Sequence, residues 1–294
     1  MTADRWAPLA GSGTVIGMDA GGSGTRAVVV RDGVVVSRPT EGPANALLHP
    51  DAVERLAALV RASGADLAGL GLPGVRTVAQ ADELAGRLNE LTGRAVTVSD
   101  DAETALLGAF GGAPGIIVIA GTGSVAYGWD GERCARAGGH GYLLGDEGGG
   151  YWLGREAVRA SLAARDRIGP RTLLCRDVEA AFGSLDAAVA TVHSRPTDRG
   201  LLAGLAIAVS RAAVAEDPVA VDIVGRAAAV LAGLVEAVQA RLGPLPACGI
   251  GRVLADTPVA EELARRVELT AAAGPPELGA ALLAVRGRLG MVTR

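Results

Sequence analysis

Two stretches of the chain repeat one pattern of apolar and small residues. In the first, apolar residues at 14–18 lead to Asp19, small residues occupy 20–25 and an apolar run follows. In the second, apolar residues at 115–119 lead to small residues at 120–124, and an apolar run follows again. A strand, a glycine-rich turn and a strand form a β-hairpin whose tip presents bare backbone N–H groups. The repetition predicts that the chain contains a duplicated unit.

The spacing of apolar positions predicts the remaining elements. Further strands are expected at 34–37, 67–72, 95–98 and 248–251. Helices are expected at 51–62, 79–91, 102–110, 151–164, 178–190, 201–215, 218–242, 257–266 and 277–289. Strands and helices alternate in the first half, whereas helices dominate the second. We therefore expect an α/β protein with an N-terminal lobe at 1–112, a C-terminal lobe at 113–276 and a final segment, 277–294, that packs back on the first lobe.

The composition places the chain among globular proteins. Of its 294 residues, 49% are hydrophobic and 20% are charged, which excludes a disordered chain. The formal net charge is -4 and no basic stripe is interleaved with aromatic residues, so nucleic acid is not an expected partner. All 28 basic residues are arginines. The absence of lysine excludes a Walker A lysine, a protein-kinase strand lysine and a lysine Schiff base.

Cysteines and apolar runs indicate neither a metal cluster nor export nor a membrane. Cys134, Cys175 and Cys248 stand apart from one another, which argues against a structural zinc or iron–sulfur site. Positions 1–13 lack the basic and apolar regions of a signal peptide. The apolar run at 200–210 is shorter than the roughly 20 residues that cross a bilayer. We expect a soluble, cytoplasmic protein.

The two hairpin tips suit a polyphosphate. Glycine lets the backbone approach a ligand closely, and successive N–H groups form a nest that binds anions without a lysine. A single glycine-rich tip is more often only a tight turn, but two matched tips about 100 residues apart favour phosphate binding. Asp19, which introduces the first tip, adds the hard oxygen ligand that Mg²⁺ requires beside phosphate.

The chain resembles the N-acetylglucosamine kinases and the related BadF/BadG/BcrA/BcrD ATPase family, within the superfamily of sugar kinases, actin and heat-shock ATPases. The most specific part of the resemblance is the glycine-rich stretch 138–152, GGHGYLLGDEGGGYW. Further matches lie at 18–25, 43–45, 99–102 and 121–124. The resemblance implies two duplicated actin-like lobes of the ribonuclease H-like type, with ATP and Mg²⁺ in a cleft between them.

The resemblance also implies which residues hold the nucleotide. The phosphates would be held by two loops, the first made of Gly21, Gly22, Ser23, Gly24 and Thr25 and the second of Gly121, Thr122 and Gly123. Asp19 would organise Mg²⁺ through water. Gly251 and Gly279 would let the adenine approach the backbone, the alternative being that each only marks a helix or strand boundary.

Asp101 matches the general base of the family, which accepts the proton of the attacking sugar hydroxyl. Its position before the helix expected at 102–110 suits an anion, because helix N-termini favour negative charge. The same position is typical of an N-cap, which is the structural alternative. With the resemblance, we expect Asp101 to be catalytic.

Asn45 and Asp146 match residues that hold the sugar in the family, and His140 and Gly141 are expected in the same part of the site. Amide and carboxylate groups suit a polyol because they supply donors and acceptors in fixed directions. The structural alternative for these residues is a role in turns. His140 stands where the sugar kinases usually have a tryptophan, which leaves sugar stacking at this position open.

The expected reaction is transfer of the γ-phosphoryl group of ATP to a hydroxyl of an amino sugar, with O6 of N-acetylglucosamine as the first candidate. A kinase for glucosamine or another hexose is an alternative, because a sequence does not locate the contacts to the sugar's 2-substituent. A non-catalytic regulator or energy-coupling ATPase of the same fold is a second alternative, which Asn45, Asp101 and Asp146 together disfavour. The expected partners are a small-molecule sugar and, by likeness to the family, a second copy of the chain in a homodimer.

Overall fold

The first predicted hairpin forms as strands β1 (Thr14–Ala20) and β2 (Thr25–Arg31), which pair antiparallel. The structure is a computed structural model whose described residues are 6–21, 24–43, 51–195, 198–255 and 257–290. Most residues of both strands are buried, because helices cover both faces of the sheet to which they belong. The local pattern of apolar residues was therefore sufficient to predict this hairpin.

The six-stranded sheet of the first hairpin has the strand order β3-β2-β1-β5-β6, and β4 also pairs with β2. Its further strands are β3 (Val34–Ser37), β4 (Thr40–Glu41), β5 (Leu67–Leu72) and β6 (Ala95–Asp100). Strands β1, β5 and β6 run parallel to one another. Their carboxyl ends therefore meet at one edge of the sheet, the kind of edge at which α/β proteins commonly bind ligands.

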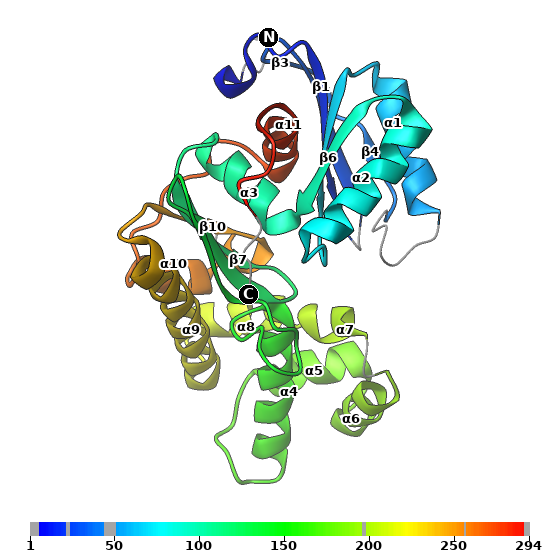
Figure 1. Ribbon diagram of the computed structural model, residues 1–294. Coiled ribbons are helices and arrows are strands. Elements are labelled where there is room, and N and C mark those ends of the chain that lie inside the picture. Colours follow the sequence, from blue (N-terminus) through cyan, green and yellow to red (C-terminus); the bar gives the residue numbers. More distant parts are fainter. Residues whose placement is uncertain (1–5, 22–23, 44–50, 196–197, 256, 291–294) are drawn as a thin grey trace. The chain divides into compact units, whose positions relative to one another are not determined.

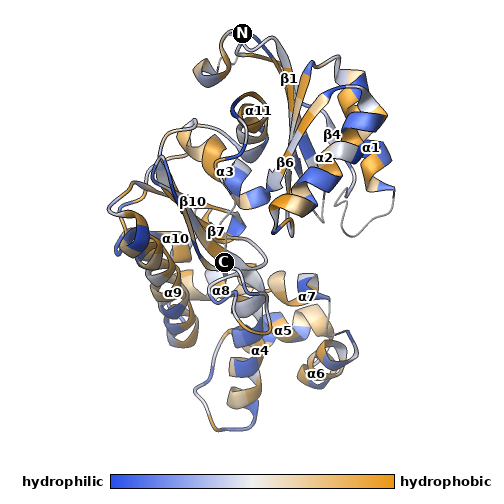
Figure 2. Ribbon diagram, viewed as in Figure 1, coloured by the Kyte–Doolittle hydropathy of each residue, from blue (hydrophilic) through white to orange (hydrophobic). Residues whose placement is uncertain are grey.

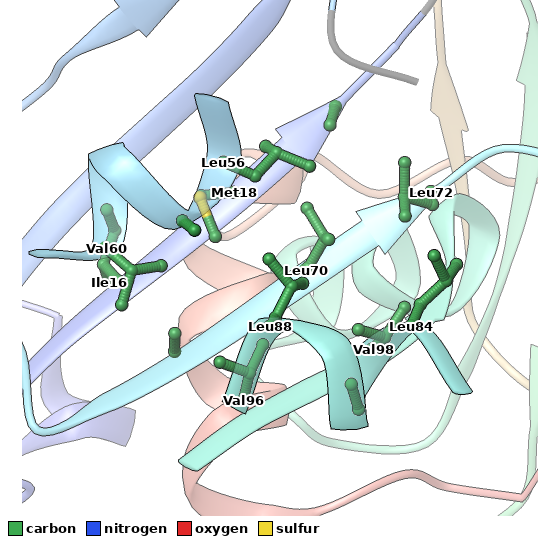
Figure 3. Close-up of a cluster of buried hydrophobic side chains, with 14 of the residues drawn as sticks. Ile16, Met18, Leu56, Val60, Leu70, Leu72, Leu84, Leu88, Val96 and Val98 are labelled. Carbon is green, nitrogen blue, oxygen red and sulfur yellow. The ribbon is translucent and has the colours of Figure 1, made fainter. Parts of the chain in front are cut away.

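Helices cover both faces of this sheet (Figure 1). One face carries α1 (Ala52–Ser63) and α2 (Val78–Thr92), and the other carries α3 (Asp101–Phe110) and α11 (Pro276–Arg286). In Figure 2, α1 and α2 show hydrophobic and hydrophilic residues side by side, as expected of helices with one buried face. Figure 3 shows the apolar cluster that they form with the strands, which includes Met18, Leu56, Leu70, Leu88 and Val98.

The last helix, α11, approaches the sheet closely. A Cβ atom on Gly17 or Gly69 would meet the backbone of α11 well inside van der Waals contact, so only glycine permits this approach. The apolar residues of α11 form a second buried cluster with β1, β2 and α3. The helix ends at Arg286, where Gly287 takes a φ of +81°, and it is therefore shorter than the predicted helix at 277–289.

A four-stranded sheet has the strand order β10-β7-β8-β9. Its strands are β7 (Gly115–Ala120), β8 (Ser124–Trp129), β9 (Cys134–Gly138) and β10 (Ala247–Ile250). Taken from the other edge, the order β9-β8-β7-β10 repeats the order β3-β2-β1-β5 of the first sheet. The duplicated α/β fold expected from the two hairpins is thereby confirmed.

The chain divides into two compact units, each built from segments that are separated in the sequence. The first unit comprises Met1–Ile117, Tyr127–Ala135 and Ala271–Arg294, and the second comprises Val118–Ala126 and Arg136–Thr270. This division differs from the expected lobes mainly at Tyr127–Ala135. That segment belongs to the first unit because the Tyr127 hydroxyl donates to the Gly290 carbonyl at 3.4 Å and Trp129 lies under Arg286.

The second unit is mainly helical, as predicted. Its helices are α4 (Gly150–Arg165), α5 (Leu174–Phe182), α6 (Leu185–Ser194), α7 (Arg199–Ala203), α8 (Ala206–Val214), α9 (Pro218–Leu242) and α10 (Pro258–Ala264). Short 3-10 turns lie at Ala7–Leu9, in the first unit, and Arg252–Leu254. The helix predicted at 178–190 is divided, because Gly183 ends α5 and Ser184 caps α6 by accepting a hydrogen bond from the Ala187 N–H. The helix predicted at 201–215 is likewise two helices.

Helix α9 is the one described helix that is long and apolar enough to cross a membrane, with a mean hydropathy of 1.8 over its most apolar window. It is more apolar over this length than the run at 200–210, from which no membrane span was expected. In the structure α9 packs against α4, α8 and α10. Arg226, near its middle, pairs with Asp222 of the same helix and with Glu156 of α4. These are the contacts of a core helix in a folded unit.

Candidate active site

The first predicted phosphate loop connects β1 and β2. The Gly21 N–H donates to the Gly24 carbonyl at 3.0 Å, which closes the turn, while Gly22 and Ser23 lie outside the described residues. Thr25 is buried, and its hydroxyl donates to the carbonyl of Gly42 at 3.1 Å. A hydroxyl proton used in this way is not available to a phosphate, so the Thr25 side chain anchors the loop.

Asp19 lies near the end of β1, directly opposite Arg26 in the hairpin register. Its Oδ2 accepts a hydrogen bond from Arg26 Nη2 at 2.7 Å, and the two side chains form an ion pair. The described residues contain no cluster of three or more acidic, His or Cys side chains that could enclose a metal ion. A single carboxylate beside a phosphate loop fits a Mg²⁺ that keeps its waters and is held mainly by phosphate oxygens.

Asp19 and Asp101 occupy the same edge of the first sheet. In the strand register Asp19 lies beside Gly71, and Gly71 lies beside Ser99, two residues before Asp101. Since neighbouring strands are about 4.8 Å apart, roughly 10 Å separates the backbones of Asp19 and Ser99. The predicted metal-organising carboxylate and the predicted base thus belong to one unit and one sheet edge.

The adjacent carboxylates Asp100 and Asp101 have different positions at the start of α3. Asp100 is the N-cap, since its Oδ1 accepts a hydrogen bond from the Ala102 N–H at 2.7 Å. Asp101 is the first residue of the helix and is half-buried. The capping role that was the structural alternative for Asp101 therefore falls to Asp100.

Glu103 is a buried acid that the sequence analysis missed. Its carboxylate accepts hydrogen bonds from the Ser99 hydroxyl and from the Leu289 N–H, both at 2.6 Å. Burial raises the pKa of Glu103, the nearby charge of Asp100 adds to the rise, and the two hydrogen bonds oppose it. An acid three residues after an N-cap aspartate, within an apolar helix, was the signal available in the sequence. Glu103 connects the end of β6 to the C-terminal segment and fixes the start of α3.

The second predicted phosphate loop connects β7 and β8. The Gly121 N–H donates to the Gly123 carbonyl at 3.0 Å, which closes a tight turn. The loop is held from behind, because its Gly121 and Thr122 carbonyls accept hydrogen bonds from Gly150 and Tyr151, the first residues of α4, at 2.7 and 3.0 Å. Thr122 is exposed, and the N–H groups of Thr122 and Gly123 have no partner among the described residues. The loop therefore offers donors to an external anion.

Glycines allow this loop to touch its neighbours through bare backbone. A Cβ on Gly149 would lie 2.7 Å from the Gly123 carbonyl carbon, and a Cβ on Gly150 would lie 3.0 Å from the Gly121 oxygen. Gly251, with a φ of +106°, lies against the backbone of Ala120. Gly251 is thus beside the second loop, and its predicted contact with adenine stays a prediction.

Asp146 is buried, accepts hydrogen bonds from two glycines of the second unit and lies against a third. Its Oδ1 accepts a hydrogen bond from the Gly141 N–H at 3.3 Å, and its carbonyl accepts one from the Gly149 N–H at 3.1 Å. Its carboxylate lies where a side chain on Gly123 would stand. Its backbone has a φ of +63°, which aspartate tolerates better than most residues. The predicted sugar ligand is therefore also a support of the second phosphate loop.

The other predicted sugar-binding residues are only partly described. Asn45 lies outside the described residues. His140 is exposed, and Gly141 next to it has a φ of +86°. Beyond them the ring of Tyr142 meets the edge of Tyr151, with ring centroids 5.0 Å apart. This aromatic pair connects the glycine-rich stretch to the first turn of α4.

The structure corrects the assignment of Gly279 to the nucleotide site. Gly279 is buried in α11, and a Cβ there would collide with the Thr104 carbonyl and with the backbone of Gly108 in α3. Glycine is required here because two helices cross at backbone distance. No space remains at this position for an adenine, so Gly279 is a helix-packing residue.

The chain matches proteins of known description. Relatives include an N-acetylmuramic acid/N-acetylglucosamine kinase of Clostridium acetobutylicum, 48% identical over 84 residues, which are 28% of each chain. The glucosamine kinase GspK of Vibrio cholerae is 29% identical over 227 residues, which are 73% of this chain and 76% of that one. The matched region is thus less than a third of the length of the first relative.

Solved structures extend the likeness over most of the chain. A proposed N-acetylglucosamine kinase from Chromobacterium violaceum is 28% identical with a TM-score of 0.73, covering 93% of this chain and 99% of that one. A ROK family glucokinase from Streptomyces griseus, solved with glucose and AMPPNP, is 21% identical with a TM-score of 0.58 and shares the fold. The family described as the BadF/BadG/BcrA/BcrD ATPase family matches residues 16–284, and the protein therefore belongs to that family.

Proposed function

We propose that the protein is an ATP-dependent kinase that transfers the γ-phosphoryl group to a hydroxyl of an amino sugar, with O6 of N-acetylglucosamine as the first acceptor to test. The observation that carries this proposal is that the two adjacent acids at the start of α3 have different positions. Asp100 caps the helix, and Asp101 stands in its first turn at the sheet edge that also bears Asp19. A base and a metal-organising acid at one edge are what phosphoryl transfer to a hydroxyl needs.

Asp101 is the proposed base. It would accept the proton of the sugar hydroxyl as the oxygen attacks the γ-phosphorus. The carboxylate stands at the N-terminus of α3, where the helix dipole favours negative charge. Glu103 holds the helix start in place through Ser99 and Leu289. Asp101 would thus be positioned by a rigid element.

The two glycine loops are the proposed phosphate sites. The unpartnered N–H groups of Thr122 and Gly123 would donate to phosphate oxygens. The first loop, Gly21 to Thr25, is proposed as the other phosphate site from its sequence. Mg²⁺, held through water by Asp19, would neutralise charge on the phosphates. The second loop is preorganised, because its Gly121 and Thr122 carbonyls accept hydrogen bonds from the Gly150 and Tyr151 N–H groups, which lowers the cost of ordering it on binding. At the end of the first loop, the Thr25 hydroxyl donates to the Gly42 carbonyl.

Sugar selection is assigned to Asn45, Asp146, His140 and Gly141. The amide of Asn45 and the carboxylate of Asp146 suit sugar hydroxyls. At position 140 the sugar would meet an imidazole instead of the usual tryptophan ring. Glucosamine is a specific second candidate, because the relative that covers 73% of this chain is named a glucosamine kinase. A homodimer in the cytoplasm remains part of the proposal.

A coupled assay for ADP release across N-acetylglucosamine, N-acetylmuramic acid, glucosamine and glucose tests the function. The proposal predicts sugar-dependent ADP release with the highest kcat/KM for an amino sugar. The Asp101→Asn variant is the control for contaminating kinases and ATPases. ADP release that does not depend on any sugar would favour an energy-coupling ATPase, and ATP binding without release would favour a regulator.

A further inference from the structure

One short stretch of chain, 286–290, contacts α3 at both of its ends. Its first residue, Arg286, donates from Nη1 to the Gly112 carbonyl at 2.5 Å, just beyond the C-cap of α3. Three residues later, the Leu289 N–H donates to the Glu103 carboxylate at 2.6 Å, in the first turn of α3. The stretch therefore reaches both ends of the helix that bears the proposed base.

Other elements of the first unit hold this stretch in place. The Gly290 carbonyl accepts a hydrogen bond from the Tyr127 hydroxyl at 3.4 Å, and Tyr127 lies in the part of β8 that belongs to the first unit. The Arg286 guanidinium lies over the ring of Trp129, at the end of the same strand, 5.6 Å from its centroid. Arg288 forms an ion pair with α2. The stretch is thus anchored independently of α3 and can fix the position of that helix.

The contact with Glu103 determines which way the first turn of α3 faces. Glu103 is 1% exposed, and its two oxygens accept hydrogen bonds from the Ser99 hydroxyl and the Leu289 N–H. An α-helix has about 3.6 residues per turn, so side chains two positions apart leave it at an angle of about 200°. Holding Glu103 inward therefore turns Asp101, which is half-buried, toward the opposite side.

Adhesion of α3 alone does not require a buried acid. The helix already packs against α11 at backbone distance, where Gly279 meets the Thr104 carbonyl. Burying a carboxylate costs free energy that an apolar side chain at 103 would not cost. What the carboxylate adds is direction, because its two oxygens accept hydrogen bonds from two fixed donors, one in β6 and one at Leu289.

We infer that residues 286–290 form a clamp that positions the proposed base, with Glu103 and Arg286 as positioning residues for Asp101. This inference rests on the proposed function. A reacting group that is displaced by about 1 Å can lose about a hundredfold in rate. Loss of the clamp should therefore lower kcat, whereas ATP, whose proposed contacts lie in the glycine loops, should bind as before.

Steady-state kinetics and isothermal titration with ATP test the clamp at Glu103. Glu103→Ala removes both acceptor oxygens and should lower kcat by about tenfold to a hundredfold, with the ATP dissociation constant unchanged. Glu103→Gln should restore most of kcat, because its amide keeps an oxygen for the Leu289 N–H and can donate to the Ser99 hydroxyl oxygen. Val60→Ala, buried in α1 on the other face of the sheet, is the control for lost stability and should keep the kcat of the unmodified protein.

Arg286→Met tests the other end of the clamp. It removes the hydrogen bond to Gly112 and should also lower kcat at constant ATP affinity. Because both contacts belong to one clamp, the double variant Glu103→Ala/Arg286→Met should lose less than the product of the two single losses.

Four outcomes would count against the clamp. Losses of kcat that multiply in the double variant would show two separate contacts, and unchanged kcat in Glu103→Ala would show that this acid does not position the base. An equal loss of kcat in Glu103→Ala and Glu103→Gln, or a matching loss of ATP affinity, would show a general structural defect. Each of these results would overturn the inference and leave the proposed function standing. An unmodified protein that releases no ADP with any sugar would overturn both.

Discussion

The carboxylate of Asp146 lies directly against the α-carbon of Gly123, in the space that any larger side chain at 123 would need. The same carboxylate accepts the Gly141 N–H, so it joins the glycine-rich stretch to the second phosphate loop. A residue at this junction can influence both substrates. Sugar recognition and phosphate positioning are therefore coupled through Asp146 in the proposed mechanism.

Gly123→Ala should distort the second loop. The added Cβ would collide with the Asp146 carboxylate, and relief of this clash must move either the loop or the acid. We expect weaker ATP binding and a lower Tm. Gly121→Ala is the control for stability, because a Cβ there meets no atom within 4 Å. Equal melting temperatures for the two variants would contradict the close contact between Gly123 and Asp146.

Asp146→Ala should weaken the binding of both the sugar and ATP. The change leaves the Gly141 N–H without its acceptor and removes the support of Gly123, and it deletes the proposed sugar ligand. The KM for the sugar should rise by about tenfold to a few hundredfold, as expected when a buried hydrogen bond is lost, and the KM for ATP should rise as well. Steady-state kinetics with each substrate varied in turn would measure this. A change in the ATP value alone would remove Asp146 from the sugar site.

Gly279→Ala should destabilise the first unit without acting on nucleotide specifically. The new methyl group would press into the backbone of α3, and overpacking of this kind costs about 1–3 kcal/mol or more. Gly233→Ala, at an exposed position of α9 with open space around the Cβ, should instead gain about 0.5–1 kcal/mol. Urea unfolding of both variants checks the contrast. A stable Gly279→Ala variant with a raised KM for ATP would return Gly279 to the nucleotide site.

Glu103 should give the protein a distinctive pH dependence of stability. Because burial raises its folded pKa above the ordinary value of 4.5, the folded protein binds this proton more tightly than the unfolded chain. The contribution of Glu103 is therefore fully present below the ordinary pKa and is lost as pH rises through the raised folded pKa. Relative to Glu103→Gln, the unmodified protein should lose unfolding free energy as pH rises above 4.5. Parallel pH profiles in urea unfolding would contradict this.

The features that the sequence predicted well are local ones. Both hairpins and helices such as α9 were predicted from residue spacing. This is possible because the spacing of apolar residues within each segment defines the face that the element buries. The division of 178–190 at Gly183 was missed since its neighbouring apolar residues continue the helical pattern. A propensity for helix does not reveal where the chain changes direction.

The features that the sequence could not predict depend on contacts between distant segments. Gly279 and Gly251 look alike as glycines near boundaries, yet one lies at a helix crossing and the other beside the second loop. Glu103 resembles a helix-start acid until Leu289 is seen to donate to it. The resemblance to the family points to Asp101 as the base, but only the structure shows that Asp100 caps the helix.

The most direct test of the central claim is a comparison of kcat for Asp101→Asn and Asp100→Asn. Asp101→Asn keeps the shape of the side chain but cannot accept the proton, so kcat should fall by roughly 10² to 10⁴ while ATP and sugar still bind. Asp100→Asn keeps an oxygen for the Ala102 N–H, and asparagine caps helices about as well as aspartate, so its kcat should stay close to that of the unmodified protein. Loss of activity in the Asp100 variant, or near-normal turnover in the Asp101 variant, would contradict the proposed mechanism.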